Sequence, residues 1–160
     1  MFDIGAIDQD LLEERPMTTI ERCHSIFVAS QTNRVPRDLL NIIVLTEGGD
    51  KGSVRLNSNG SWDMGPAQVN TLHKDLILSH YPDITWQQFS TDVFANIDIS
   101  AKIFRQCIND PAIGNSGWDA VGCYNSRTIN IKTNYLFRAM STYDRVQQDK
   151  SGVLACSNYW

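Results

Sequence analysis

The chain has 160 residues, of which 42% are hydrophobic and 20% are charged, and its formal net charge is −4. This length fits a single domain that buries roughly 70% of its unfolded surface. The negative charge argues against a nucleic-acid partner, because proteins that bind nucleic acid present basic patches. No apolar run approaches the roughly 20 residues of a membrane-spanning helix, so we expect no membrane span.

The two ends of the chain carry no clear helical pattern. We expect residues 1–17 to form a flexible N-terminal arm, residues 18–148 the domain, and residues 149–160 a C-terminal tail. The acidic start lacks the basic and apolar regions of a secretory signal. It fits either a cytoplasmic protein or a mature form that has lost its signal and gained a methionine. Four scattered cysteines without CxxC spacing argue against a zinc ribbon and fit either disulfides or buried thiols.

The domain is predicted to begin with two helices. The first starts at a capping box formed by Thr18 and Glu21. Its apolar residues at helical spacing are Ile20, Cys23 and Phe27. The second starts near Pro36 and is apolar nearly all round, so it should run through the core.

Glu47 lies at the C-terminal end of this second helix, immediately before the Gly48-Gly49 pair that ends it. The helix dipole and the apolar surroundings both disfavour the charged carboxylate and therefore raise its pKa. A general acid needs such a pKa near neutral pH. Glu47 is therefore the candidate catalytic acid; otherwise it is a solvated glutamate at a helix end.

A β-hairpin is predicted after this helix. Strands over 54–57 and 61–64 flank Asn59-Gly60, the signal of a two-residue type I′ turn. The second strand carries Asp63, a second carboxylate close in sequence to Glu47. Two carboxylates that face each other across a groove can cleave a glycosidic bond.

The remainder of the chain has helical patterns, so we expect an α+β fold that is mostly helical. The predicted helices run over 71–80, from a capping box at Thr85, from Asp92 to Ile108, from Ser116 to Tyr124, and across 135–146. The last of them carries Tyr135, Leu136, Ala139, Met140, Tyr143 and Val146.

Two segments carry a set of residues in a characteristic order. These are Glu47, Asn57, Asn59, Gly60, Ser61, Asp63, Gly65, Gln68, Val69 and Asn70, followed by Trp118, Ala120, Val121, Tyr124 and Asn125. The set resembles the lysozyme-like superfamily, most closely its lytic transglycosylase branch, over residues 18–143. The small specialised enzymes of type IV secretion, conjugation and pilus systems are the most similar. The chain departs from the branch at Gly48, at Pro66-Ala67 and at Ser126-Arg127.

The resemblance implies a lysozyme-like catalytic domain with the hairpin beside the active-site groove. It implies that Glu47 protonates the oxygen that links N-acetylmuramic acid to N-acetylglucosamine. The same carboxylate would then take the proton of the muramyl C6 hydroxyl, which attacks C1 and gives a 1,6-anhydro product. Tyr124 would hydrogen-bond Glu47, and Asp63 would have a structural or substrate-orienting role.

The resemblance also implies the residues that bind the sugar. These are Gln68, Asn70, Asn125, Trp62 and Ser61. Trp62 could equally be a packing residue beside a turn, and Tyr124 an ordinary core tyrosine. Gln68 and Asn70 could equally serve only to tie the hairpin to the next helix. We expect no cofactor, and no metal site because the three histidines lack further ligands.

Two other functions remain open. The first is a hydrolysing muramidase that uses both Glu47 and Asp63, and the second is a non-catalytic glycan-binding subunit that kept the fold. The resemblance implies a monomeric periplasmic or secreted protein whose partners are peptidoglycan strands and proteins of a secretion, conjugation or pilus machine. In that compartment the cysteines should form disulfides, and we favour a Cys107–Cys123 pair on neighbouring helices.

Overall fold

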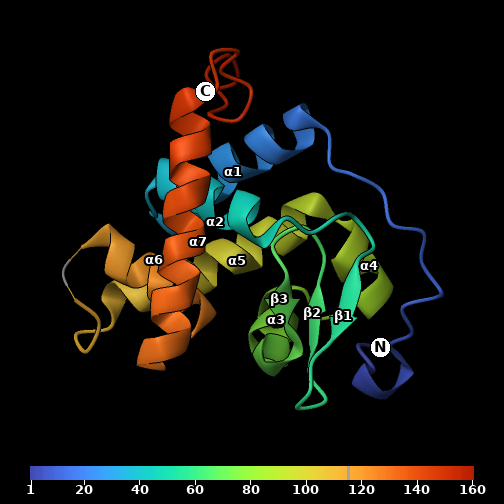
Figure 1. Ribbon diagram of the computed structural model, residues 1–160. Coiled ribbons are helices and arrows are strands. Elements are labelled where there is room, and N and C mark those ends of the chain that lie inside the picture. The colour runs from blue at the N-terminus through green and yellow to red at the C-terminus, as the bar shows by residue number, and fades with distance from the viewer. Residues whose placement is uncertain (115) are drawn as a thin grey trace.

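The computed structural model describes residues 1–114 and 116–160 and is mostly helical, with one small antiparallel sheet (Figure 1). This confirms the mostly helical α+β class. The helices are η1 (Ile4–Ala6), α1 (Thr19–Asn33), α2 (Arg37–Glu47), η2 (Thr71–His73), α3 (Lys74–His80), α4 (Trp86–Thr91), α5 (Val93–Asn109), α6 (Gly117–Asn125) and α7 (Ile129–Gln148). The strands are β1 (Val54–Leu56), β2 (Trp62–Met64) and β3 (Val69–Asn70).

The helix α5 runs through the middle of the fold and packs against α1, α4 and α6, while α7 packs against α2 and α6 (Figure 1). The predicted central helix, α2, is buried at five consecutive positions, 40–44, of which all but Asn41 are aliphatic. Each such aliphatic side chain removed from water contributes about 1.5–3 kcal/mol. The core therefore holds α2 firmly and fixes the position of its last residue, Glu47.

The first helix begins as predicted but is rotated about its axis relative to the prediction. The Glu21 amide donates to Thr18 Oγ1 (3.1 Å), and the Thr18 amide donates to Glu21 Oε1 (3.3 Å), which completes the capping box. The expectation that Ile20 faces inward was wrong, because Ile20 is 62% exposed. Its inward face follows Cys23, Ile26 and Ala29, since that face meets α5.

The two predicted strands pair with each other, but through a different turn. Val54 pairs with Met64, and Leu56 with Trp62. The Gly60 amide donates to the Asn57 carbonyl (3.0 Å), and the Asn57 amide donates to the Ser61 carbonyl (2.8 Å). Gly60 alone in this loop has a positive φ, +83°. A type I′ turn needs two such residues, so the connection is the three-residue loop with glycine in the left-handed position.

A third strand, β3, was not predicted. It pairs with β2 through Asp63 with Asn70 and Met64 with Val69. Two residues are too few to show the alternation of polar and apolar side chains by which a strand is recognised. This pairing brings Asn70 beside Asp63.

Both terminal segments lie against the domain. In residues 1–17, Phe2 is 2% exposed and packs edge-on to Phe89, and Arg15 pairs through its backbone with Lys51. The C-terminal residues 149–160 are held by the buried Arg22, whose guanidinium donates to the carbonyl oxygens of Val153 (2.9 Å) and Leu154 (3.1 Å).

The four cysteines form two disulfides, Cys107–Cys123 and Cys23–Cys156. The first is the pair favoured from the sequence. The second ties α1 to the C-terminal segment. In the part of the chain that the structure describes, none of the helices is long and apolar enough to span a membrane.

Candidate active site

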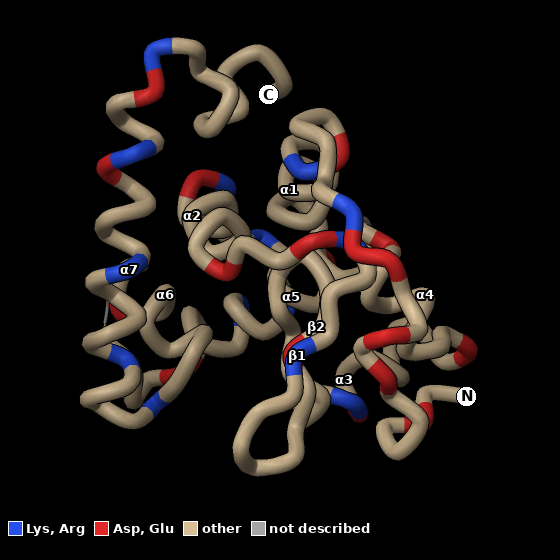
Figure 2. The backbone as a smooth tube through the Cα atoms, turned by 45° about the vertical axis from the view of Figure 1, so that its right-hand side comes forward, with Lys and Arg blue, Asp and Glu red and all other residues tan. Residues whose placement is uncertain are grey.

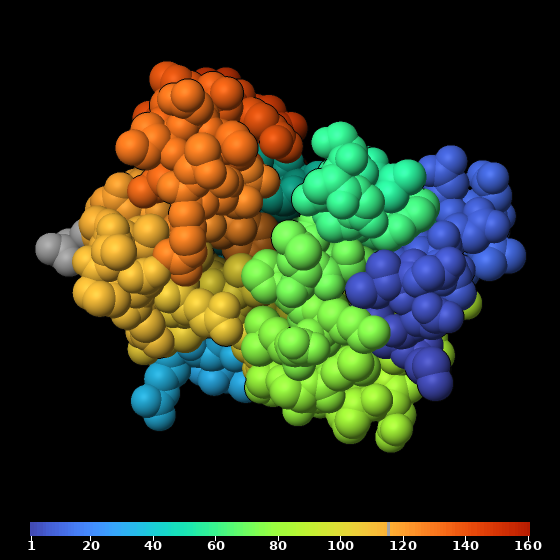
Figure 3. All heavy atoms as spheres, turned by 90° about the horizontal axis from the view of Figure 1, so that it is seen from below, coloured from blue at the N-terminus to red at the C-terminus, as the bar shows by residue number. Residues whose placement is uncertain are grey.

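A cavity of about 450 Å³ opens between the sheet and the helices α6 and α7. Figure 3 shows the hollow between the α7 side of the molecule, in orange, and the sheet side, in green. The polar residues that line the cavity are Glu47, Asn57, Ser58, Asn59, Ser61, Asp63, Gln68, Asn70, His73, Tyr124, Asn125 and Ser126. Most of these side chains are neutral amides or hydroxyls, which suits a polar, uncharged ligand.

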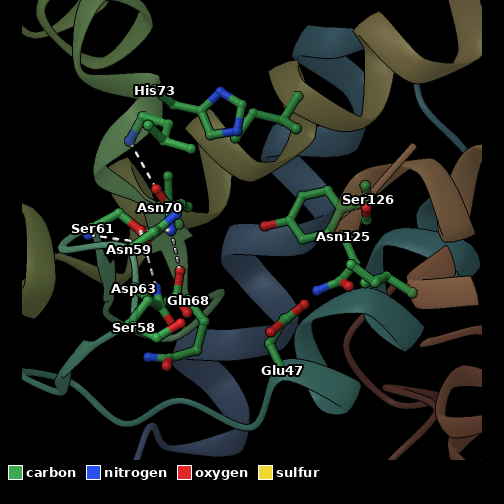
Figure 4. Close-up of a pocket in the computed structure, with 16 residues that line it drawn as sticks. Glu47, Ser58, Asn59, Ser61, Asp63, Gln68, Asn70, His73, Asn125 and Ser126 are labelled. Atoms are coloured by element: carbon green, nitrogen blue, oxygen red, sulfur yellow. Dashed lines mark hydrogen bonds between the residues drawn. The ribbon is translucent and has the colours of Figure 1, made fainter. Parts of the chain in front are cut away.

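Glu47 lies at the end of α2 and points into this cavity (Figure 4). Gly48 ends the helix in a left-handed conformation (φ +61°), and its amide donates to the Val44 carbonyl (3.1 Å). Burial raises the pKa of Glu47 from 4.5 to about 7. The nearby Asp63 also raises this pKa, whereas Tyr135, Arg138 and Arg55 lower it. A carboxyl group with this pKa can both give and take a proton near neutral pH.

Two residues of α7 reach Glu47 from the side away from the sheet. Tyr135 is 2% exposed, and its hydroxyl lies beside the Glu47 carboxylate, whose pKa it lowers as a donor, although it forms no hydrogen bond of regular geometry within the described residues. Burial and the neighbouring Glu47 raise the pKa of Tyr135 well above its usual value, so the hydroxyl keeps its proton. Arg138 lies with its guanidinium carbon 5.6 Å from the centre of the Tyr135 ring and donates to the Thr46 carbonyl (3.1 Å). The sequence assigned Tyr135 only to the last predicted helix.

The predicted hydrogen bond between Tyr124 and Glu47 is not formed in the structure. The Tyr124 hydroxyl donates instead to the carbonyl oxygen of Ala67 (3.0 Å), in the turn before β3. Tyr124 nevertheless lines the cavity, and burial followed by the charge of Glu47 raises the pKa of its hydroxyl. Its clearest role is to tie α6 to the sheet side of the cavity.

Asp63, Ser61 and Asn70 come together as the sequence predicted. The Asn70 side-chain amide donates to Asp63 Oδ1 (2.8 Å) and to Ser61 Oγ (3.0 Å), as Figure 4 shows. Ser61 in turn donates to Asn59 Oδ1 (2.7 Å). The network holds the Asp63 carboxylate in one orientation at the wall of the cavity.

Gln68 and Asn125 also line the cavity, at its opposite sides. The Gln68 amide nitrogen donates to Ser53 Oγ (2.9 Å) and to the Gly65 carbonyl (2.9 Å), so it holds the turn between β2 and β3. Asn125 is exposed at the end of α6. Gln68 is therefore engaged within the protein, whereas the exposed amide of Asn125 is accessible from solvent.

The structure does not bring Trp62 into the cavity. Alternate residues of a strand point to opposite faces, and Trp62 shares its face with the buried Met64. It packs partly buried against the hydrophobic core. The expected stacking on a sugar is therefore not supported, and the packing interpretation of Trp62 agrees with the structure.

His73 lines the cavity, although the sequence suggested an ordinary surface histidine. It is half-buried, and burial lowers the pKa of its imidazole. A neutral imidazole can donate one hydrogen bond and accept another. His73 follows the predicted sugar-binding residue Asn70 by three positions, and this proximity in sequence was the available signal that His73 lies near the cavity. Across residues 1–114 and 116–160, no group of three acidic, histidine or cysteine side chains could hold a metal ion.

Two exposed apolar side chains complete the cavity. Leu72, on the sheet side, is 76% exposed, and Ile131, on α7, is 52% exposed. Sugar rings have apolar faces of C–H groups beside their hydroxyls, so a cavity of amides with two aliphatic contacts matches a saccharide. Together with Glu47 these features define a site suited to acid–base chemistry on a polar, uncharged ligand.

Comparison with known proteins adds a limited relationship. No family model matches the chain. Over 102 residues it is 30% identical to Protein IpgF of Shigella flexneri and, equally, to Protein IpgF of Shigella sonnei. The match covers 62% of this chain and 63% of each relative, so the chain spans less than two thirds of the length of these curated relatives.

Proposed function

We propose that the protein is a peptidoglycan lytic transglycosylase that cleaves the bond between N-acetylmuramic acid and N-acetylglucosamine. The observation that carries this proposal is the position of Glu47, at the end of a buried helix, in a cavity lined by amides, with a pKa raised to about 7. The resemblance of the sequence to that enzyme branch, which includes Glu47, the hairpin and Tyr124-Asn125, supports it.

In the proposed reaction, protonated Glu47 donates its proton to the glycosidic oxygen as the bond from that oxygen to C1 breaks. The muramyl C6 hydroxyl then attacks C1, and its proton passes to the Glu47 carboxylate. The new bond between O6 and C1 closes the 1,6-anhydro ring, and the acid is regenerated. No water is consumed, so one carboxyl group serves as acid and then as base.

The surroundings of Glu47 support both steps. Burial favours the protonated acid, while Arg138 and the Tyr135 hydroxyl favour the carboxylate that remains after proton transfer. These opposed effects hold the pKa near neutrality. Asn70, Asn125 and the neutral His73 offer hydrogen bonds to sugar hydroxyls and acetamido groups.

Asp63 supports an alternative, a hydrolysing muramidase, because its carboxylate lines the same cavity as Glu47. In a hydrolase that carboxylate would stabilise the positive charge at C1 until water attacks. Its bond from Asn70 fits this role as well as an orienting one. The nature of the new chain ends distinguishes the two reactions.

The two disulfides fit a protein that works outside the cytoplasm. The periplasm, which contains peptidoglycan, is the compartment we propose. A local opening of the wall for a secretion, conjugation or pilus machine is the role that the resemblance favours.

Digestion of purified sacculi followed by mass spectrometry tests the proposal. A transglycosylase releases fragments with 1,6-anhydro ends, whereas a hydrolase releases reducing ends. Absence of any release, with Glu47 intact and the protein folded, would leave only a glycan-binding role.

A further inference from the structure

A second cavity, of about 440 Å³, lies beside the first at the end of α2. It is lined by Thr46, which directly precedes Glu47, and by one face of α7. The α7 residues are Phe137, Arg138, Ser141, Thr142 and Arg145. The two cavities therefore share the last turn of α2.

Basic side chains border this second cavity, although the net charge of the chain is −4. Among the residues that the structure describes, five cations are paired with carboxylates; these are Arg15, Lys51, Lys102, Arg127 and Lys132. Within the described residues, Arg138 and Arg145 form no ion pair. Figure 2 shows basic residues recurring along α7. Two guanidinium groups that form no ion pair in the described part of the chain therefore border one cavity.

The floor of the cavity is already ordered. Arg138 donates to the Thr46 carbonyl (3.1 Å), and the Thr46 hydroxyl donates to Thr142 Oγ1 (3.0 Å). Thr142 donates in turn to the Arg138 carbonyl (3.1 Å). A site whose groups are held before a ligand arrives loses less conformational entropy on binding.

We propose that this cavity binds a carboxylate of the peptide attached to the glycan strand. This inference rests on the proposed function. Guanidinium groups match the two oxygens of a carboxylate, and the Ser141 hydroxyl adds a donor. Phe137, which is 68% exposed, offers an apolar surface for a peptide side chain. The second cavity begins at Thr46, directly before Glu47, so a peptide attached to a sugar in the first cavity would start near it.

The test compares Arg145→Gln with the wild-type protein on two substrates. One is intact sacculi with their peptides, and the other is the same glycan stripped of peptides by an amidase. We expect the substitution to lower kcat/KM about two- to fivefold on the peptide-bearing glycan, as for loss of an exposed charge pair, with no change on the stripped glycan. Added salt should shrink the difference between wild type and variant, because it screens exposed charges.

The matched control is Lys150→Gln, which removes one exposed positive charge outside the cavity. It should leave both rates unchanged. Equal losses for Arg145→Gln on both substrates, no loss on either, or the same loss in Lys150→Gln would each overturn the inference.

A binding measurement separates this inference from the proposed function. If the wild type cleaves neither glycan, the proposed function fails. Calorimetry with a disaccharide-peptide and with the bare disaccharide still tests the cavity. Tighter binding of the peptide form that is lost in Arg145→Gln supports the anion site, and equal affinities reject it.

Discussion

The guanidinium of Arg138 donates a hydrogen bond to the carbonyl oxygen of Thr46, at 3.1 Å. Thr46 directly precedes Glu47, so α7 holds the end of α2 at the point where the candidate acid leaves the helix. The last carbonyl groups of a helix lack intrahelical partners, and a cation is the favourable partner for them. One residue thus orders the backbone of the site and lowers the pKa of Glu47.

Replacement of Glu47 by glutamine removes the only proton donor that the proposed reaction uses. We expect the loss in rate to be at least about 10²–10⁴-fold, the contribution of general acid catalysis. Release of anhydro fragments from sacculi, measured by mass spectrometry, checks it. Asn57→Ala, at the edge of the same cavity, is the comparison and should retain most of the activity. Turnover close to wild type in Glu47→Gln would reject the assignment.

The raised pKa of Glu47 also predicts how stability depends on pH. The folded protein holds this proton more tightly than the unfolded chain, with a pKa of about 7 against 4.5. The stabilisation is complete below the unfolded pKa and is lost as the pH rises through the folded pKa. Relative to Glu47→Gln, the wild type should therefore lose up to about 3 kcal/mol of unfolding free energy between pH 4.5 and 8.

Urea unfolding of both proteins at a series of pH values measures this difference. The exposed Glu14→Gln serves as the control, and its difference from the wild type should stay flat. A constant gap between wild type and Glu47→Gln across the range would contradict the pKa shift.

Tyr135→Phe should move the pH profile of cleavage in a defined direction. Tyr135 lowers the pKa of Glu47, so its removal raises that pKa. Glu47 then stays protonated to higher pH, so the alkaline limb of the kcat/KM profile should shift to higher pH. The measurement is the rate of glycan cleavage from pH 5 to 9.

Tyr124→Phe is the matched control for that experiment, because Tyr124 bonds Ala67 and not Glu47. It should lower the unfolding free energy by about 0.5–1.5 kcal/mol because a hydrogen bond is lost. The alkaline limb of its kcat/KM profile should lie at the same pH as in the wild type. A shift in Tyr124→Phe without one in Tyr135→Phe would reverse the two roles.

Asp63→Asn separates the two proposed reactions. If Asp63 only orients the site, the variant should still form anhydro ends, at a rate reduced by about tenfold or less, because its amide can keep the network with Asn70. Asp63 also raises the pKa of Glu47, so the alkaline limb should move to lower pH. Loss of all products in this variant would favour the hydrolase.

The two disulfides should contribute unequally to stability. Cys23–Cys156 joins residues 133 apart in sequence, and Cys107–Cys123 joins residues 16 apart. On the chain-entropy account their removal costs roughly 5 and 3 kcal/mol, respectively. Alanine at both cysteines of each pair, followed by urea unfolding, provides the comparison. Equal losses would contradict the chain-entropy account and would show that loop length does not set the cost of removing each disulfide.

Local interactions explain which features could be predicted. The capping box of Thr18 and Glu21 connects residues three apart, so its presence needs no knowledge of the rest of the fold. Gly48 ends α2 through its own backbone conformation. The two strands on either side of Asn59-Gly60 are joined by a short loop, so the fact that they pair is also a local feature. The position of Glu47 at the end of a buried helix could therefore be predicted from the sequence.

The identity of the tyrosine beside Glu47 depends on contacts between distant segments. The rotation of α6 and α7 about their own axes decides that Tyr135 faces Glu47 and that Tyr124 bonds Ala67. That rotation is set by packing against α2 and α5, which no local pattern records. The place of His73 in the cavity could not be predicted for the same reason, and the choice between packing and sugar stacking for Trp62 was likewise decided only by which face of β2 meets the core. The sequence alone determined the candidate acid and the helix that carries it, whereas only the tertiary packing decided which groups surround it.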